Sequence, residues 1–355
     1  MKEFITKILQ FLLIPFCIAI LLDLFISGKM KHSSDHPWEN EVWNEIYQGK
    51  VEADIVIYGS SKGWTHFNPV MIEQAFNLPC YTLGLNASNI LWQHIRHKEY
   101  LKFNPPPKLI ILSLDINTLI RKTTPTNYYM PYMLWRMDIY RELKRYNNVN
   151  KGVDYIMPLI RYLYLSNLIG ETNLFRSLLK VNARQTHVGD SPKILKTHKT
   201  GTFRYKGHRG MNIEWTRDFR EAKQKYESYT IQIDTALISF LEHFIEVINR
   251  QNIDLIFVYS PTYIEGQHFV ENRDQIVSIF NNLSEKHDIP FFDYSDSLIS
   301  YRKELFYNTQ HLNKKGSELF TRQLIEDLRK HEQTASYIQK AGGIIESHEE
   351  LTSSE

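Results

Sequence analysis

Residues 53–61 read ADIVIYGSS, and this stretch settles the fold class. Its first six residues form a short apolar run with β-branched side chains, which is typical of a parallel strand buried on both faces. The run ends in a Gly-Ser-Ser turn, and Asn68 and Pro69 then open a predicted helix with proline in its first turn. The stretch therefore predicts a strand, a turn and a helix in succession.

The same rhythm recurs further along the chain. Apolar runs predict more strands, at residues 80–84, 109–115, 254–259 and 290–293. Helical patterns predict an entry helix within 36–50 and later helices at 89–103, 270–287 and 313–329. Strands that alternate with helices favour right-handed crossovers, a parallel sheet and helices on both of its faces. We therefore expect a three-layer α/β/α sandwich with a mainly parallel sheet.

The rhythm is interrupted in the middle of the chain. An insertion at about 120–225 is rich in Tyr, Arg, Asn and Leu, and its segment 150–181 has a helical pattern. Insertions of this size commonly form lids or partner surfaces. A long helix over 217–252 is predicted to lead back to the sheet. We expect one domain over 31–335, followed by a polar, disordered tail at 336–355.

The first thirty residues have a different composition. Residues 4–27 are mostly apolar, with an unbroken run from Phe11 to Leu22 that ends at Asp23. This length approaches the roughly 20 residues that span a bilayer. No cleavage site of the A-x-A kind follows, which favours an uncleaved, single-pass signal anchor with the following domain outside the cytoplasm. Lysines flank both ends, so charge bias leaves the orientation open. The alternative is a long apolar helix docked on the domain.

Composition excludes several function classes. The net charge of +2 over 355 residues argues against a dedicated nucleic-acid binder. Cys17 lies in the apolar segment, so Cys80 has no partner for an internal disulfide in the remaining chain. The chain has no Cys/His cluster, and His94 and His97, although three residues apart, have no evident carboxylate partner. We expect no metal and no cofactor.

Ser61 and His311 are the candidates for nucleophilic chemistry. Ser61 follows a buried strand, at the sheet edge where open α/β folds bind their ligands, and the helix after it offers N–H groups to an oxyanion. A serine nucleophile needs a base, and residues 306–313, FYNTQHLN, place His311 after the last strand and before a helix. The alternatives are structural: Ser61 as a helix cap and His311 as a residue with a structural hydrogen bond.

These blocks resemble the SGNH hydrolase superfamily, which has a flavodoxin-like sandwich fold. The match is closest to its GSS branch, which includes the D-alanine transfer protein of teichoic acid modification and proteins paired with membrane-bound O-acyltransferases. The resemblance implies Ser61 as nucleophile and His311 as base. It places oxyanion donors at Ser61, at Ala87 in the second block (82–87), and at Asn117 in the third block (113–117), where Asp115 replaces the usual Asn.

Asn308 departs from the pattern, because the superfamily usually has Asp three residues before the histidine. An amide oxygen can accept the N–H of the imidazole and orient it, but it cannot stabilise the imidazolium by charge. Three interpretations remain open: a Ser–His dyad suffices, another carboxylate such as Asp293 or Asp296 takes the role, or the site is degraded.

Two function classes follow from the resemblance. The first is a membrane-anchored, extracytoplasmic serine esterase or O-acyltransferase that acts on an acylated envelope polysaccharide, with a membrane-bound O-acyltransferase as partner. The second is a non-catalytic accessory protein of such a system. His66 lies near Ser61 in the sequence, without an assigned role. The basic segment 206–210 is either a lid that contacts a glycan or phosphate, or a solvated loop.

Overall fold

The computed structural model describes residues 2–31, 39–121, 135–146, 156–160, 204–213 and 215–345. Its contacts divide the chain into two compact units. Unit 1 comprises residues 1–48 and 122–203, and unit 2 comprises residues 49–121 and 204–355. The inserted part of the chain therefore ends near residue 203, whereas we expected it to continue to about 225.

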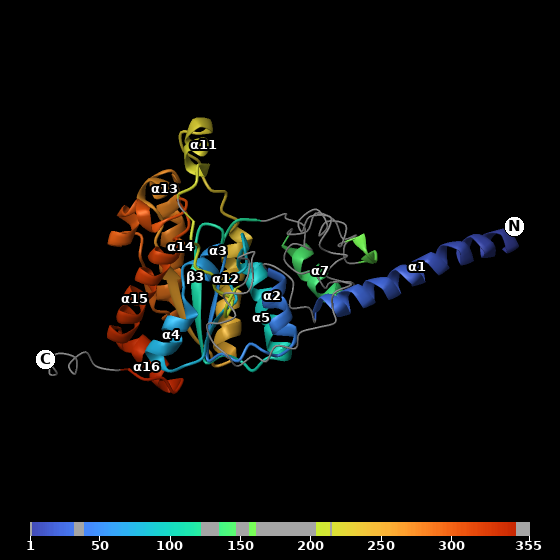
Figure 1. Ribbon diagram of the computed structural model, residues 1–355, viewed down its shortest axis with the longest axis horizontal. Helices are drawn as coiled ribbons and strands as arrows, with labels where there is room; N and C mark the ends of the chain where they lie inside the picture. Colours follow the sequence, from blue (N-terminus) through green and yellow to red (C-terminus); the bar gives the residue numbers. More distant parts are fainter. Residues whose placement is uncertain are drawn as a thin grey trace. The chain divides into compact units, whose positions relative to one another are not determined.

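Unit 2 contains a five-stranded, fully parallel sheet in the order β2-β1-β3-β4-β5 (Figure 1). Its strands are β1 (Ile55–Gly59), β2 (Cys80–Thr82), β3 (Leu109–Leu114), β4 (Asp254–Tyr259) and β5 (Phe291–Asp293). Every residue of β1, β2 and β3 is buried, as the apolar runs predict. The predicted α/β/α sandwich with a parallel sheet is confirmed.

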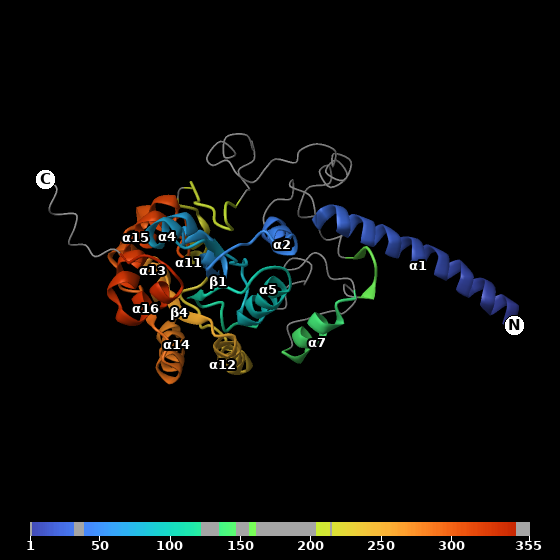
Figure 2. The same cartoon turned by 90° about the horizontal axis from the view of Figure 1, so that it is seen from below.

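Helices cover both faces of this sheet (Figures 1 and 2). On one face, Ile55 and Ile57 share a core with α4 (Pro69–Phe76), α15 (Lys314–Lys330) and α16 (Glu332–Lys340). On the other face, Tyr58 contacts rings of α5 (Ile90–Phe103) and α12 (Thr235–Arg250), and α14 (Arg273–His287) packs beside α12. Shorter elements are α3 (Ser61–Thr65), α11 (Asp218–Lys225), α13 (Ile264–His268) and the 3₁₀ turns η2 (Leu298–Tyr301) and η3 (Lys303–Leu305).

Strand register determines which loops meet. Gly59 pairs with Ser113, and Leu114 pairs with Tyr259, so β1, β3 and β4 end at the same edge. Gly59 has φ +155°, and a Cβ atom there would lie 2.7 Å from the Cβ atom of Ser113. The tight turn after β1 therefore requires glycine, and the residues that follow each strand are gathered at the carboxyl edge.

Unit 1 contains α1 (Lys2–Lys31), α2 (Glu39–Tyr47) and α7 (Met137–Arg145). Within α1, residues Phe11–Gly28 are long and apolar enough to cross a membrane, judged by length and composition. Asp23 lies in this window with its side chain fully buried. Its carboxylate accepts hydrogen bonds from Ser27 Oγ at 3.3 Å and from the Leu159 backbone N–H at 2.7 Å. The one acidic group of this window is thus buried and hydrogen-bonded within unit 1.

Two predicted elements were wrong. The expected helix over 217–252 is broken into α11 and α12, because residues 226–234 are not helical and Asp234 caps α12 by accepting the Ala236 N–H at 3.0 Å. Tyr229 in this break forms a bridge with Val270. The tail expected to be disordered from 336 instead continues as α16, with Ile338 fully buried. Residues 346–355, and all of 150–181 except 156–160, lie outside the described residues.

Candidate active site

Ser61 is the first residue of α3, directly after the turn that ends β1. Two hydrogen bonds of the Ser60 side chain hold the start of α3 in place. The Ser60 Oγ donates a hydrogen bond to the Asp115 carboxylate and accepts the Lys62 N–H at 3.5 Å, which caps the short helix. Ser61 is therefore held at the carboxyl edge of the sheet, with its side chain only partly buried.

His311 lies beside Ser61 in the structure, although it belongs to the C-terminal part of unit 2. The Ser61 Oγ and His311 Nε2 atoms lie 2.6 Å apart, although the residues are separated by 250 positions in the chain. The imidazole stacks on the Tyr307 ring, with 5.3 Å between centroids and 7° between planes. The structure therefore brings together the two residues that the sequence predicted as nucleophile and base.

Asn308 determines the tautomer of His311. Its Oδ1 accepts the backbone N–H groups of Gln310 at 3.0 Å and His311 at 2.9 Å, so this atom must be the amide oxygen. The same oxygen lies 2.9 Å from His311 Nδ1, which must therefore carry the proton. Nε2 is then the unprotonated nitrogen and accepts the Ser61 hydroxyl proton, which is the orientation that a general base requires.

No carboxylate takes the place of Asn308 on His311 Nδ1. Asp293, one of the two candidates, accepts the Ser295 N–H at 2.9 Å instead. Among the described residues, no hydrogen bond joins Asp296 to His311, whose Nδ1 lies against Asn308. The orienting group is therefore neutral.

Lys62 supplies a positive charge beside the pair. Its side chain is buried, and its Nζ donates to Thr262 Oγ1 at 2.5 Å and lies 5.5 Å from the centroid of the Tyr259 ring. Burial lowers the pKa of Lys62 to about 8, and the Asp115 carboxylate partly offsets this effect. Burial, together with the Lys62 charge, lowers the pKa of His311 to about 3. The base is thus held neutral over the physiological range.

Of the groups predicted to donate to an oxyanion, one backbone N–H, that of Asn117, is engaged elsewhere. The Asn117 main-chain N–H is committed to Asp115 Oδ1 at 2.6 Å, and the other oxygen of Asp115 accepts Ser60 Oγ. Asp115 therefore anchors Ser60 and the backbone of Asn117 through its two oxygens. Ala87 adopts a left-handed conformation with φ 50° in an exposed turn. The donor roles of the Ser61 and Ala87 N–H groups and of the Asn117 side chain stay predictions.

The second block packs directly against the nucleophile helix through Gly84. A Cβ atom at Gly84 would lie 2.7 Å from the Trp64 nitrogen and 3.0 Å from the Ser60 carbonyl oxygen. Trp64 Nε1 also donates to Asn86 Oδ1 at 2.6 Å. The turn that carries Ala87 is thereby held next to Ser61 by close backbone contact, which only glycine permits.

His66 has a role that its position in the sequence did not reveal. Its Nε2 accepts the Leu312 N–H at 3.1 Å, so Nδ1 carries the proton and donates to Ser260 Oγ at 2.8 Å. Burial and the nearby Lys62 charge lower the pKa of His66 well below its usual value. A neutral His66 therefore ties the end of α3 to the end of β4 and to the residue that follows His311.

The basic segment 206–210 is not a solvated loop. Arg204, which precedes it, is buried with its guanidinium 3.9 Å from the centroid of the Trp64 ring. His208 Nδ1 donates to the Trp64 carbonyl oxygen at 2.8 Å, and the Thr82 N–H donates to the Lys206 carbonyl oxygen at 3.0 Å. The segment is packed onto the site, and the interpretation as a solvated loop was wrong.

His94 and His97 lie on α5, away from this edge. Both ring nitrogens of His97 are engaged, Nδ1 with the Tyr58 hydroxyl and Nε2 with Gln251 Oε1, each at 2.9 Å. Among the described residues, no group of three or more His, Cys, Asp or Glu side chains is arranged to hold a metal ion.

No family model and no curated protein sequence matches the chain. Solved structures that are similar include an acetyl xylan esterase, at 11% identity and TM-score 0.38, covering 77% of this chain and 98% of that one. A putative acylhydrolase from Bacteroides fragilis has 11% identity and TM-score 0.35, covering 82% and 99%. A GDSL-like lipase from Bacteroides thetaiotaomicron has 11% identity and TM-score 0.34, covering 77% and 87%. At these TM-scores the likeness carries no argument about activity, which rests on the site itself.

Proposed function

We propose that the protein is a serine esterase or O-acyltransferase in which Ser61 forms an acyl-enzyme and His311 acts as general base. The observation that carries the proposal is the chain of contacts from Ser61 Oγ to His311 Nε2, and from His311 Nδ1–H to Asn308, at 2.6 and 2.9 Å. A nucleophile, a base of the correct tautomer and an orienting acceptor are the parts that acyl transfer through serine requires.

The reaction would proceed in two steps. Ser61 Oγ attacks the ester carbonyl carbon while its proton passes to His311 Nε2, and the alcohol then leaves with that proton. The acyl group remains on Ser61 as an ester. Water or a sugar hydroxyl next attacks this ester and gives its proton to Nε2, and Ser61 recovers the proton as it leaves. Water completes hydrolysis, and a hydroxyl completes transfer.

The substrate class is proposed from the anchor and from the motifs together. A helix apolar enough to cross a membrane lies near the start of the chain, and this supports a membrane anchor. The extracytoplasmic location of unit 2 is proposed from the resemblance alone. The GSS motif and the His311 block resemble proteins that modify acylated envelope polysaccharides. A transferase would also need an activated acyl group delivered through the bilayer, hence a membrane-bound O-acyltransferase as partner.

The neutral orienting group favours a second candidate, a non-catalytic accessory protein of such a system. The neutral Asn308 adds no negative charge to stabilise a protonated His311, and burial and the Lys62 charge oppose that protonation. In this case the surface around Ser61 would bind the glycan or the partner without catalysing a reaction.

Active-site labelling distinguishes the two candidates. The full-length protein, in detergent, is treated with a fluorophosphonate, and the modified residue is identified by intact mass and peptide mapping. An enzyme is expected to carry one adduct, on Ser61, which is lost in His311→Ala and retained in the matched control His268→Ala, where an exposed histidine is removed. A folded protein that takes no adduct and does not cleave p-nitrophenyl acetate would instead support the accessory role.

A further inference from the structure

An acidic residue, Asp23, lies inside the apolar window of α1, before its end at Gly28. At a rise of about 1.5 Å per residue, Asp23 lies about 7–8 Å from that end. Its side chain is fully buried, whereas Leu22 and Leu24 on either side are 48% and 52% exposed. A carboxyl group at this depth of a bilayer is unfavourable unless protein shields it from lipid and donates hydrogen bonds to it. A membrane-spanning α1 therefore needs a protein neighbour at Asp23.

Residues 156–160, from the inserted part of the chain, supply such a neighbour within unit 1. The Leu159 backbone N–H donates to one Asp23 carboxylate oxygen at 2.7 Å, across 136 positions of sequence, and Ser27 Oγ donates to the other at 3.3 Å. Leu159 has φ +66°, which is uncommon for a residue with a bulky side chain and persists only where surrounding contacts hold it. The segment is therefore docked on α1 in a defined conformation.

The composition of this segment suits hydrocarbon. Residues 156–160 read IMPLI and contain no polar or charged side chain. Inside a bilayer, a non-helical backbone is tolerated only where protein satisfies its polar groups. Leu159 lies in a turn, and Asp23 accepts its N–H, while Pro158 before it has no N–H to satisfy. The contact thus provides the carboxylate with donors and the turn with an acceptor.

Two apolar side chains of the segment stay uncovered. Ile156 and Met157 are 49% and 42% exposed, and Pro158 is buried. Three residues of chain span at most about 11 Å, so Ile156 remains near the level of Asp23 along α1. The exposed side chains therefore lie beside the apolar window of α1, where lipid is the expected surrounding.

We propose that residues 156–160 form a second membrane-contacting segment, which docks on α1 at Asp23 and places Ile156 and Met157 among lipid acyl chains near the bilayer surface. The inference rests on the membrane anchor of the proposed function and goes beyond it. The inserted part of the chain returns to the bilayer after α1 has left it, and the Asp23 carboxylate holds the two segments together.

Lipid contact is measured on the full-length protein in lipid nanodiscs, with a fluorescent probe on one introduced cysteine. Cys17→Ser removes the exposed native thiol, and the buried Cys80 is kept. The probe is placed at Ile156→Cys or at one of two matched positions, Ile18→Cys and Ile213→Cys. The isoleucines at 156, 18 and 213 are 49%, 52% and 43% exposed.

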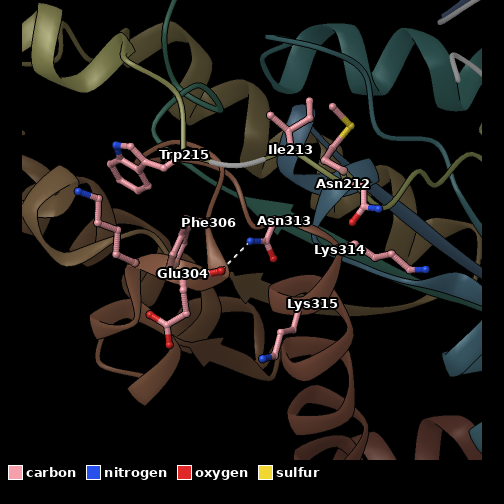
Figure 3. A pocket seen from close by; sticks show the side chains of 10 residues that line it. Asn212, Ile213, Trp215, Glu304, Phe306, Asn313, Lys314 and Lys315 are labelled. Atoms are coloured by element: carbon pink, nitrogen blue, oxygen red, sulfur yellow. Dashed lines mark hydrogen bonds between the residues drawn. The ribbon is translucent and has the colours of Figure 1, made fainter. Parts of the chain in front are cut away.

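The two reference positions have different surroundings. Ile18 lies near the middle of the apolar window of α1. Ile213 lines a pocket of unit 2, together with Trp215 and Asn313 (Figure 3). The quenchers are lipids that carry a spin label either near the head group or near the end of the acyl chain, and aqueous iodide. Lipid spin labels report contact with hydrocarbon, and iodide reports contact with water.

The head-group spin label is expected to quench the probe at position 156 about twofold or more as strongly as the probe at 213, and iodide should quench it less. The probe at 18 should respond most to the chain-end label, because it lies deeper. Asp23→Leu removes the acceptor of the Leu159 N–H, so lipid quenching at 156 should fall by about half or more. Asp23→Asn keeps an oxygen there and should preserve the quenching.

Two results would overturn the proposal. If iodide quenches the probe at 156 as strongly as the probe at 213 and neither lipid quenches it, the segment does not contact the bilayer. If lipid quenching at 156 is the same in Asp23→Leu and Asp23→Asn, the Asp23 carboxylate does not hold the segment.

These outcomes are separable from those of the proposed function. Lipid quenching at position 18 but not at 156 keeps the anchor and removes only the second segment, whereas quenching at neither position removes both. Fluorophosphonate labelling of Ser61 tests the chemistry and depends on neither probe.

Discussion

Asn308 and Lys62 together decide how basic His311 can become. Asn308 orients the imidazole through a neutral oxygen, and burial, together with the Lys62 charge, lowers the pKa of the ring to about 3. Burial and the Lys62 charge oppose the imidazolium that forms when Ser61 gives up its proton, and Asn308 adds no negative charge to stabilise it. In an active enzyme, the free energy of forming this imidazolium would limit the rate more than the geometry does. The Ser61 Oγ and His311 Nε2 atoms are already within hydrogen-bond distance.

Replacing Asn308 by aspartate should therefore raise activity. In Asn308→Asp the carboxylate can still accept the N–H groups of Gln310 and His311, and it adds the charge that stabilises the imidazolium. We expect kcat for p-nitrophenyl acetate to rise by about tenfold or more. Asn308→Ala, which removes the acceptor, should lower it. A kcat for Asn308→Asp at or below that of the parent would show that imidazolium stability does not limit the reaction.

Lys62 should control the acid limb of the pH–rate profile. The base works only when neutral, so with a His311 pKa of about 3 the value of kcat/KM should stay level down to about pH 4. In Lys62→Met the opposing charge is gone, so the pKa of His311 rises and the acid limb moves to higher pH. Asp115, Asp293 and Arg273 stay in place around the site. Thr262→Val is the control, because it removes the hydrogen-bond partner of Lys62 but keeps the charge. An unmoved limb would contradict this assignment.

Among the helices and strands, α3 is the element on which the site depends. It carries Ser61 at its start, and His66 at its end bonds Ser260 after β4 and the N–H of Leu312 beside His311. A single side chain thus connects three segments that are far apart in the sequence. His66 is a positioning residue, since its hydrogen bonds go to Ser260 and Leu312 and its ring packs edge-on against that of His311, with 6.2 Å between centroids.

Substitution of His66 should misplace the base without changing substrate affinity. His66→Phe removes both hydrogen bonds, and kcat should fall by between about tenfold and a hundredfold with KM nearly unchanged. His66→Gln can keep an acceptor near the Leu312 N–H, so it should recover part of the loss. Equal kcat values for the two variants, at equal thermal stability, would refute the positioning role.

Local patterns predicted most elements, and tertiary contacts explain the failures. The strands and the Ser61, Asn308 and His311 positions could be predicted because apolar runs and short motifs are local signals. The break between α11 and α12 could not, because residues 226–234 are held by a bridge to Val270 and by contacts with Asn272, about forty positions later. Likewise, nothing near Lys62 in the sequence points to Thr262, 200 residues away.

For the chain as a whole, buried neutral histidines should make the fold acid-sensitive. Burial lowers the pKa of His97 and His208 to about 4, and the pKa values of His66 and His311 are lowered as well. An unfolded histidine binds its proton below about pH 6.5. Between about pH 6.5 and 4 the unfolded state therefore holds more protons than the native state, so stability falls as the pH falls.

The measurement is the Tm of the full-length protein from pH 7.5 to 5, a window above the range in which carboxylates titrate. We expect Tm to fall steadily below about pH 6.5. His208→Gln, which removes one of these groups, should show a shallower decline. A Tm that is constant across this window would mean that these histidines are as readily protonated in the native state as in the unfolded one.

The separation of Ser61 from His311 in the sequence also sets a delay between their synthesis. A ribosome adds roughly 5–20 residues per second, so the 250 positions between the two residues take about 12–50 s to synthesise. The pairing of β3 with β4 likewise joins Leu109 to Asp254, across the insertion. Ser61 is therefore synthesised long before its base, and its hydroxyl has no His311 partner until residue 311 has been made.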